Sequence, residues 1–205
     1  MIFVRDKGRM CNNILQYGHL YAWARANNRK TVSMRFAYKY QYFHICRTRW
    51  HNFFVYLFAK YAAQLKLIPT VTFDTPDEDL TEKEKAMRRG CLVAEGWFAR
   101  WYDLFLQYKP EILFLFAFDS HIESKVTSLL ETSSKEGIIR LGVHIRRGDY
   151  ATWNNGRFLY DDKQMINIIR QFILLHPNKR VVIYICGNDP KLNKQAYSEA
   201  FGQEN

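Results

Sequence analysis

The sequence predicts an α/β protein, because two stretches of the chain each alternate strand, helix and strand. The first stretch lies within residues 2–34 and the second within residues 139–186. A polar stretch of Thr, Ser, Lys, Glu and Gly at residues 131–137 precedes the second one and suggests a boundary. We therefore expect an N-terminal α/β domain over residues 1–130 and a second domain over residues 131–205.

The N-terminal elements follow from a change in the spacing of apolar residues. Residues 2–4 are apolar and predict a short strand. From residue 12 or 13 to Asn27, apolar side chains recur with the spacing of a helix. Residues 31–34 then predict a second strand, so this part of the chain forms one strand–helix–strand unit.

The middle of the chain carries weaker patterns. Residues 38–61 are aromatic and basic, and we expect a helix in their later half. A helix start is predicted at residues 75–78, where a threonine can cap, a proline suits the first turn and a glutamate can close a capping box. Residues 90–99 show no clear pattern, and Pro110 should begin or break any helix within residues 101–118.

The second domain has the clearest pattern. Apolar and polar residues alternate over residues 139–146, which predicts a strand with one apolar face. A loop over residues 147–160 leads to a helix whose apolar stripe covers residues 165–173 and which Pro177 ends. Residues 181–186 predict a buried strand, and the helical crossover makes the two strands parallel.

Composition limits the partners that the protein can have. The formal net charge of +10 allows contact with nucleic acid or a membrane surface, a basic cleft for a diphosphate, or basic residues that only face solvent. The four cysteines are widely spaced, as expected for reduced thiols in a cytoplasmic protein. No apolar run approaches the roughly 20 residues of a membrane span, so we expect at most peripheral contact with the inner membrane face.

The end of the strand at residues 139–146 carries the most informative side chains. His144 and Arg146 are two positions apart and can point the same way, toward the edge where parallel sheets bind ligands. Two adjacent arginines, Arg146 and Arg147, suit a diphosphate, and Asp149 can orient an arginine. The alternative is a surface ion pair between one of these arginines and Asp149.

The segment at residues 144–150, His-Ile-Arg-Arg-Gly-Asp-Tyr, resembles the first nucleotide-binding motif of the alpha-1,2-fucosyltransferases, H-x-R-R-G-D-Y. Residues 8–18 resemble the same family's G-G-L-G-N-Q-x-F-Q-Y-A stretch, and a weaker match lies at residues 186–190. The N-terminal residues that match in register are Gly8, Asn12, Gln16 and Tyr17, whereas Arg9, Cys11 and Asn13 depart from the pattern.

The resemblance implies a GT-B-like glycosyltransferase that transfers fucose from GDP-fucose to a glycan hydroxyl, with inversion and without a metal. Arg146 matches the arginine that holds the donor diphosphate and stabilises the leaving group, so it is the expected catalytic residue. The donor-binding residues that the resemblance implies are His144, Arg146, Arg147, Asp149, Asn12 and Gly8. No cofactor is expected besides the nucleotide-sugar donor substrate.

Two alternatives and one expectation about length accompany this assignment. The family's later motifs should follow the strand at residues 181–186, beyond the end of this sequence. We therefore expect the opening half of a Rossmann-like nucleotide-binding domain, with weak or undetectable GDP-fucose binding and no turnover by these residues alone. The alternatives are a basic nucleic-acid-binding module and a non-catalytic transferase remnant. In the main assignment, no nucleic acid is expected as a partner. The sequence carries no signal for the oligomeric state.

Metal sites have little support in the sequence. Residues 77–79 match the D-x-D pattern of metal-dependent glycosyltransferases, but carboxylates are equally expected in the first turn of a helix. His44, Cys46 and His51 lie close together in the sequence without a suitably spaced fourth ligand. We therefore expect no metal.

Overall fold

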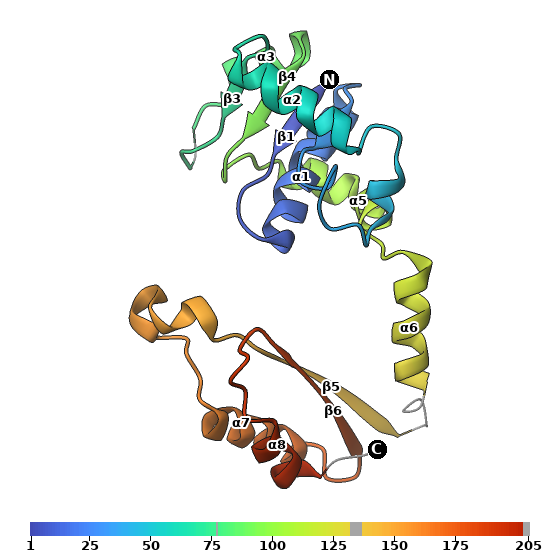
Figure 1. The fold of residues 1–205 in the computed structure, drawn as a ribbon, viewed down its shortest axis with the longest axis vertical. Coiled ribbons are helices and arrows are strands. Elements are labelled where there is room, and N and C mark those ends of the chain that lie inside the picture. Colours follow the sequence, from blue (N-terminus) through green and yellow to red (C-terminus); the bar gives the residue numbers. More distant parts are fainter. Residues whose placement is uncertain (77, 132–136, 203–205) are drawn as a thin grey trace. The chain divides into compact units, whose positions relative to one another are not determined.

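The computed structural model describes residues 1–76, 78–131 and 137–202 (Figure 1). The chain divides into two compact units, which we call unit 1 (Met1–Ser124) and unit 2 (Lys125–Asn205). Each unit contains its own parallel sheet, so the predicted α/β class is confirmed. We expected the boundary between residues 130 and 131, and the structure divides after Ser124, within the helix α6 (Ser120–Glu131).

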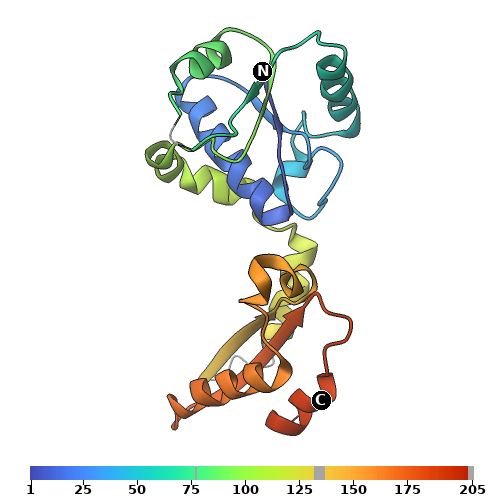
Figure 2. The same ribbon diagram turned by 90° about the vertical axis from the view of Figure 1, so that its left-hand side faces the viewer.

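The sheet of unit 1 has four parallel strands in the order β2-β1-β4-β3 (Figure 2). The strands are β1 (Ile2–Arg5), β2 (Thr31–Ser33), β3 (Thr70–Thr72) and β4 (Leu92–Glu95). Phe3 of β1 lies opposite Val32 of β2 and Val93 of β4. Because β1 and β4 each have a neighbour on both sides, nearly all of their side chains are buried.

Helices cover both faces of this sheet. Successive residues of a strand point to opposite faces, so each strand contributes to two clusters. Phe3 packs in a cluster with Ala59 of α2, whereas Ile2 and Val4 pack in another cluster with Tyr17 of α1. The helical elements of unit 1 are α1 (Met10–Ala26), the 3₁₀ turn η1 (His44–Arg47), α2 (Phe53–Gln64), α3 (Thr81–Arg89), α4 (Tyr102–Gln107), α5 (Lys109–Leu115) and the start of α6.

Several local predictions for unit 1 are confirmed. The first strand, the first helix and the second strand form where the apolar spacing placed them, as β1, α1 and β2. The later half of residues 38–61 is helical, as part of α2. Pro110 lies in the first turn of α5, where its missing N–H costs no hydrogen bond, and α4 ends before it.

The helix start predicted at residues 75–78 is wrong, because α3 begins at Thr81. Thr75 Oγ1 does donate to Glu78 Oε2 (3.2 Å), but the Glu78 carboxylate pairs with Lys83 and no helix forms there. Instead, Asp79 Oδ1 accepts from the backbone N–H (3.0 Å) and the hydroxyl (2.6 Å) of Thr81. Residue 77 lies outside the described residues.

Unit 2 is built on the predicted parallel strand pair. The strands β5 (Ile138–Ile145) and β6 (Arg180–Gly187) pair over their whole length. The connection contains the 3₁₀ turns η2 (Gly148–Ala151) and η3 (Trp153–Gly156) and the helix α7 (Asp162–Leu174), and α8 (Lys194–Phe201) follows β6. The predicted loop, helix and second strand are therefore confirmed. The predicted burial of that strand is wrong, because every residue of β6 is half-buried or exposed.

The core of unit 2 lies on one face of the strand pair. Val143 and Ile145 of β5 pack with Ile166 and Ile169 of α7 and with Tyr197 of α8. The residues between them on β5 point to the other face, and Figure 1 shows α7 and α8 together on one side of the strand pair. The core of unit 2 therefore lies between the strand pair and these two helices.

Candidate functional site

The turn after β5 directs the motif side chains. Ile145 is the last buried residue of the strand, at 2% exposure, and Arg146 continues the chain beyond the sheet. Gly148 has a φ of 23°, and a Cβ atom there would lie 3.0 Å from Nδ2 of Asn188, beyond the end of β6. The backbone N–H of Arg147 donates to Oδ1 of Asn188 (3.1 Å). The two strand ends are thus joined by contacts that leave little room for a side chain at position 148.

Arg146 is held in place by its own loop. Its Nη2 donates to Oδ2 of Asp149 (2.8 Å), and its guanidinium lies over the ring of Tyr150, 4.5 Å from the centroid. The hydrogen bond to Asp149 raises the pKa of Arg146, so the guanidinium stays charged. About a third of the Arg146 side chain remains exposed. The residue therefore presents a fixed positive charge that a ligand can reach.

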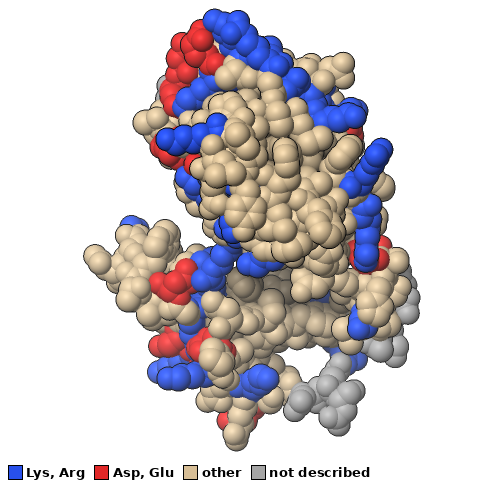
Figure 3. All heavy atoms as spheres, turned by 45° about the horizontal axis from the view of Figure 1, so that its top comes forward, with Lys and Arg blue, Asp and Glu red and all other residues tan. Residues whose placement is uncertain are grey.

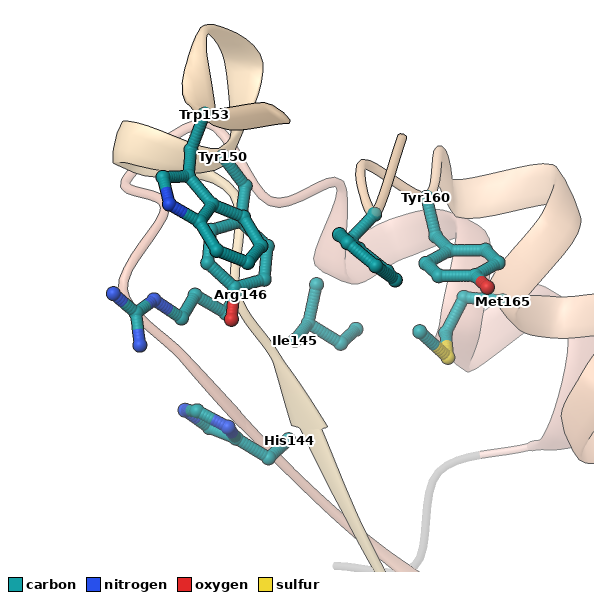
Figure 4. A pocket seen from close by; sticks show the side chains of 8 residues that line it. His144, Ile145, Arg146, Tyr150, Trp153, Tyr160 and Met165 are labelled. Atoms are coloured by element: carbon teal, nitrogen blue, oxygen red, sulfur yellow. The ribbon is translucent and has the colours of Figure 1, made fainter. Parts of the chain in front are cut away.

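Arg146 borders a cavity of about 500 Å³ in unit 2 (Figure 4). The lining residues are His144, Ile145, Arg146, Tyr150, Trp153, Phe158, Tyr160 and Met165. The rings of Tyr150 and Trp153 stack at 5.3 Å with an interplanar angle of 21°, and Trp153 lies 5.4 Å from the ring of Phe158. The cavity thus combines a cation with flat apolar surfaces, which suits a ligand that carries both an anion and a ring.

Arg147 has different partners from Arg146. Its guanidinium donates to Asp162 (2.6 Å) and Asp189 (3.4 Å), and its Nε donates to the carbonyl oxygen of Tyr160 (3.0 Å). Tyr197 of α8 donates to the same oxygen of Asp162 (2.9 Å), and Arg147 lowers the pKa of the Asp162 carboxyl. With only 15% of its side chain exposed, Arg147 ties the end of β5 to α7 and to the segment after β6.

Gly8 and Asn12 belong to unit 1. Gly8 has a φ of 85°, and a Cβ atom there would lie 2.8 Å from the ring of Trp97 and 3.0 Å from Nδ2 of Asn12. The loop between β1 and α1 is held by Gln16, whose side chain accepts from the N–H of Lys7 (3.0 Å) and donates to its carbonyl oxygen (2.8 Å). Asn12 lies in the first turn of α1 and is exposed.

The predicted site residues therefore fall into three groups. His144, Arg146 and Asp149 gather at the cavity of unit 2, where Figure 4 shows His144 and Arg146 extending from the end of β5. Arg147 is directed into the carboxylate network beside it. Gly8 and Asn12 contact each other in unit 1.

Sequence analysis missed the aromatic wall of the cavity. Trp153, Phe158 and Tyr160 lie in the loop between β5 and α7, and Met165 is on the first turns of α7. The available signal was the density of aromatic residues in a loop directly after the motif, because a loop has little core in which to bury them.

The residues considered for a metal have other roles. Nε2 of His51 accepts from the backbone N–H of Ser33 (3.0 Å), and its Nδ1 lies 2.6 Å from the hydroxyl of Thr48. Burial lowers the pKa of His51 to about 4, so the ring is neutral. Within residues 1–76, 78–131 and 137–202, no group of three or more His, Cys, Asp or Glu side chains has an arrangement that could hold a metal ion.

Other general features bear on partners. Lysine and arginine side chains form several separate groups on the face drawn in Figure 3, with acidic side chains between some of them. All four cysteines are free thiols, as predicted. In the described part of the chain, no helix combines the length and the apolar character needed to cross a bilayer.

The site defines an α/β protein with a cationic, aromatic ligand cavity at the carboxyl end of a parallel strand. No protein-family model matches the chain, and no curated protein matches it. Among solved structures, it is similar to POFUT1 in complex with GDP (12% identity), in an apo form (11%) and in complex with GDP-fucose (9%). Each match has a TM-score of 0.47 and covers 97% of this chain and 80 or 81% of that chain. The functional assignment therefore rests on the residues of the site.

Proposed function

We propose that the chain is a glycosyltransferase whose unit 2 binds the diphosphate of GDP-fucose and whose reaction passes fucose to a glycan hydroxyl. The observation that carries this proposal is the placement of Arg146. Its guanidinium follows a parallel strand, is fixed by Asp149 and Tyr150, and borders the aromatic cavity. The motif at residues 144–150, which resembles the first nucleotide-binding motif of the alpha-1,2-fucosyltransferases, supplies the choice of donor.

The chemistry needs a positive charge where Arg146 lies. The bond between the anomeric carbon and the diphosphate oxygen breaks, and the electron pair leaves with GDP. The acceptor oxygen bonds to the opposite face of the sugar, which inverts the configuration, and its proton passes to a base. Because negative charge grows on the leaving diphosphate, a guanidinium already fixed by Asp149 stabilises the transition state more than the bound donor.

The cavity itself fits a nucleotide sugar. Its volume of about 500 Å³ lies within the roughly 300–1,000 Å³ that is typical of ligand pockets. The stacked rings of Tyr150 and Trp153 offer a flat surface for a base or a sugar, and His144 adds a polar group on the same side as Arg146. Arg147 acts as a positioning residue in this proposal, since its guanidinium already binds two carboxylates.

Two further parts of the proposal concern unit 1 and the reaction conditions. We propose that Gly8 and Asn12 contribute to donor binding, as the second motif implies, in a GT-B-like protein. We propose a metal-independent reaction, in which the charge of Arg146 takes the part that a cation has in metal-dependent transferases.

Titration with GDP tests the proposal directly. Ligand-observed NMR detects binding even at millimolar dissociation constants, so it suits a weak site. We expect saturation transfer from the unaltered chain to GDP. The affinity of Arg146→Ala for GDP, obtained from the same signal, should be at least tenfold weaker. Arg157→Ala is the matched control, because Arg157 lies over the ring of Phe158 in the same loop but does not line the cavity.

The same titration separates the rival functions. Equal affinity of Arg146→Ala and the unaltered chain for GDP, or no binding of GDP at all, would contradict the proposed donor site. A salt-sensitive affinity for RNA or DNA without any response to GDP would favour a basic nucleic-acid-binding module instead. Binding of GDP without any turnover of GDP-fucose would favour a non-catalytic remnant.

A further inference from the structure

Unit 1 contains a cavity of its own, of about 270 Å³. It lies where β1 and β2 end, with α2 beside it. The lining residues are Arg5, Asp6, Met34, Arg35, Tyr38, Tyr56, Lys60 and Gln64. In open parallel α/β sheets, this carboxyl edge is where ligands bind, because loops of different strands converge there. None of these residues belongs to the donor site proposed in unit 2.

Positive charge dominates the wall of this cavity. Arg5 is paired with Glu95 (3.0 Å), but Arg35 donates to the hydroxyl of Tyr38 (2.8 Å) and to the backbone oxygen of Asp6 (3.3 Å) rather than to a carboxylate. The ammonium of Lys60 lies 5.5 Å from the ring of its neighbour Tyr61. Among the described residues, neither Arg35 nor Lys60 has a carboxylate oxygen within ion-pair distance. Two cations in one cavity thus form no ion pair with a protein carboxylate among the described residues, although Asp6 lies in the same wall.

Asp6 supplies only part of a negative charge at neutral pH and little below it. Its side chain is 1% exposed, and burial raises its pKa to about 7. Ser33 donates to its Oδ2, whereas its Oδ1 is buried and has no hydrogen-bond partner among the described residues.

An aromatic pair forms the apolar part of the same wall. The rings of Tyr38 and Tyr56 lie 4.3 Å apart, centroid to centroid, with an interplanar angle of 36°. Tyr38 comes from the loop after β2 and Tyr56 from α2, so the two surfaces meet only in the folded unit. Aromatic faces of this kind pack against the apolar faces of sugar rings.

We propose that the cavity of unit 1 binds a small ligand that carries an oxyanion on a ring, of the class of sugar phosphates and uronates. Arg35 and Lys60 neutralise the oxyanion, and the tyrosine pair packs against the ring. The volume suits a single sugar ring with its charged substituent and is too small for a nucleotide sugar. This site is separate from the proposed function and does not depend on it.

Calorimetry or ligand-observed NMR with four probes tests the proposal on the whole chain. The probes are glucose 6-phosphate, glucuronate, glucose and inorganic phosphate. We expect the two charged sugars to bind at least tenfold more tightly than glucose, because glucose lacks the oxyanion. Glucose 6-phosphate should also bind more tightly than inorganic phosphate, because phosphate lacks the ring. A preference between the two charged sugars identifies the oxyanion as a phosphate or a carboxylate.

Variants of Lys60 decide whether the binding occurs in this cavity. Lys60→Met should weaken binding of the preferred charged sugar about tenfold, and Lys60→Arg should retain most of it. Lys66→Met, which removes a charge just beyond α2 without touching the cavity, is the matched control. Circular dichroism of each variant checks that the unit is folded.

The outcomes separate this site from the donor site. Arg146→Ala should leave binding of the charged sugar unchanged, and Lys60→Met should leave binding of GDP unchanged. Three outcomes would overturn the proposal. The first is equal affinity for glucose and glucose 6-phosphate, and the second is an equal loss of affinity in Lys60→Met and Lys66→Met. The third is no binding of either charged sugar at a concentration on the order of ten millimolar, which is high enough to detect a weak site.

Discussion

At the scale of single residues, the two adjacent arginines after β5 have opposite environments. Arg146 is about a third exposed, carries one carboxylate partner and borders the cavity. Arg147 is largely buried between two carboxylates that belong to separate segments of unit 2. The same residue type therefore has two environments here, beside the cavity at Arg146 and between the segments of unit 2 at Arg147.

Substituting Arg146 by lysine tests the geometry of that contact. A lysine ammonium is a point charge, whereas the guanidinium can donate to Asp149 and to a diphosphate at once through separate N–H groups. We expect Arg146→Lys to lose most of the affinity for GDP, about as much as Arg146→Ala. Ligand-observed NMR compares the three forms, and near-normal affinity of the lysine variant would show that charge alone suffices.

Substituting Arg147 tests the positioning role. Arg147→Met leaves the carboxylates of Asp162 and Asp189 without their cation, so we expect the free energy of unfolding to fall by about 1–3 kcal/mol. Urea unfolding followed by circular dichroism measures the change. Arg157→Met is the control, since Arg157 is exposed and should shift stability little. An unchanged stability of Arg147→Met would argue that the network contributes nothing to the fold.

The buried carboxyl of Asp6 predicts a dependence of stability on pH. Its folded pKa of about 7 lies above the ordinary value of 3.8, so between these values the folded state holds a proton that the unfolded state has lost. Its contribution to stability is therefore full below about pH 4 and is lost as pH rises to about 7. Arg35 and Ser33, which face the carboxyl, only partly offset the effect of burial.

Asp6→Asn removes this titration. We expect the melting temperature of the variant, relative to the unaltered chain, to be higher at pH 8 than at pH 5. Asp74→Asn is the control, because Asp74 is exposed and pairs with Lys7 at the surface. A difference in melting temperature that is the same at both pH values would mean that Asp6 does not titrate in this range.

At the scale of elements, α7 is the helix with the best-defined start. Asp161 accepts from the backbone N–H of Gln164 (2.7 Å), and the Gln164 side chain accepts from the N–H of Asp161 (2.9 Å), which is a complete capping box. This helix covers the strand pair and begins beside the Arg147 network. The start of α7 therefore helps to set the position of the loop that carries the aromatic wall.

Removing this cap should weaken unit 2 by a modest amount. We expect Asp161→Ala to lower the free energy of unfolding by about 1 kcal/mol, the usual cost of losing an N-terminal cap. Lys163→Ala, two residues later and outside the capping box, should change it by less than about 0.5 kcal/mol. Urea denaturation of both variants provides the comparison, and equal values would show that the capping box does not stabilise the helix.

Among the elements that the sequence did not predict are two short strands of unit 1, β3 with three residues and β4 with four. Their strand conformation depends on pairing with each other and with β1, which lies about 90 positions earlier in the chain than β4. The local spacing of apolar residues does not indicate such distant partners.

At the scale of the whole molecule, a metal-independent reaction predicts that chelation has no effect. Glu78 pairs with Lys83, and Asp79 accepts a hydrogen bond from Thr81. In the proposed function, the positive charge at the donor site comes from Arg146. We expect GDP binding to be unchanged in excess EDTA. Loss of binding with EDTA and recovery with Mn²⁺ would contradict the mechanism, and addition of Mn²⁺ to an untreated sample serves as the control.

The sequence by itself determined the α/β class, the parallel pair β5 and β6 with its helix, and the location of Arg146 at the end of a strand. These depend on local spacing: an alternating strand of eight residues, a helical stripe and a contiguous motif of seven residues. The start of α3 at Thr81 depends on nearby groups, Asp79 with Thr81 and Glu78 with Lys83, which the capping pattern at residues 75–78 does not reveal. Only the tertiary structure decided the partners of Arg147 and the two cavities. The physical reason is that these depend on groups far apart in the sequence, such as Arg147 with Asp189 or Arg35 with Lys60, which come together only when strands pair and helices pack over them.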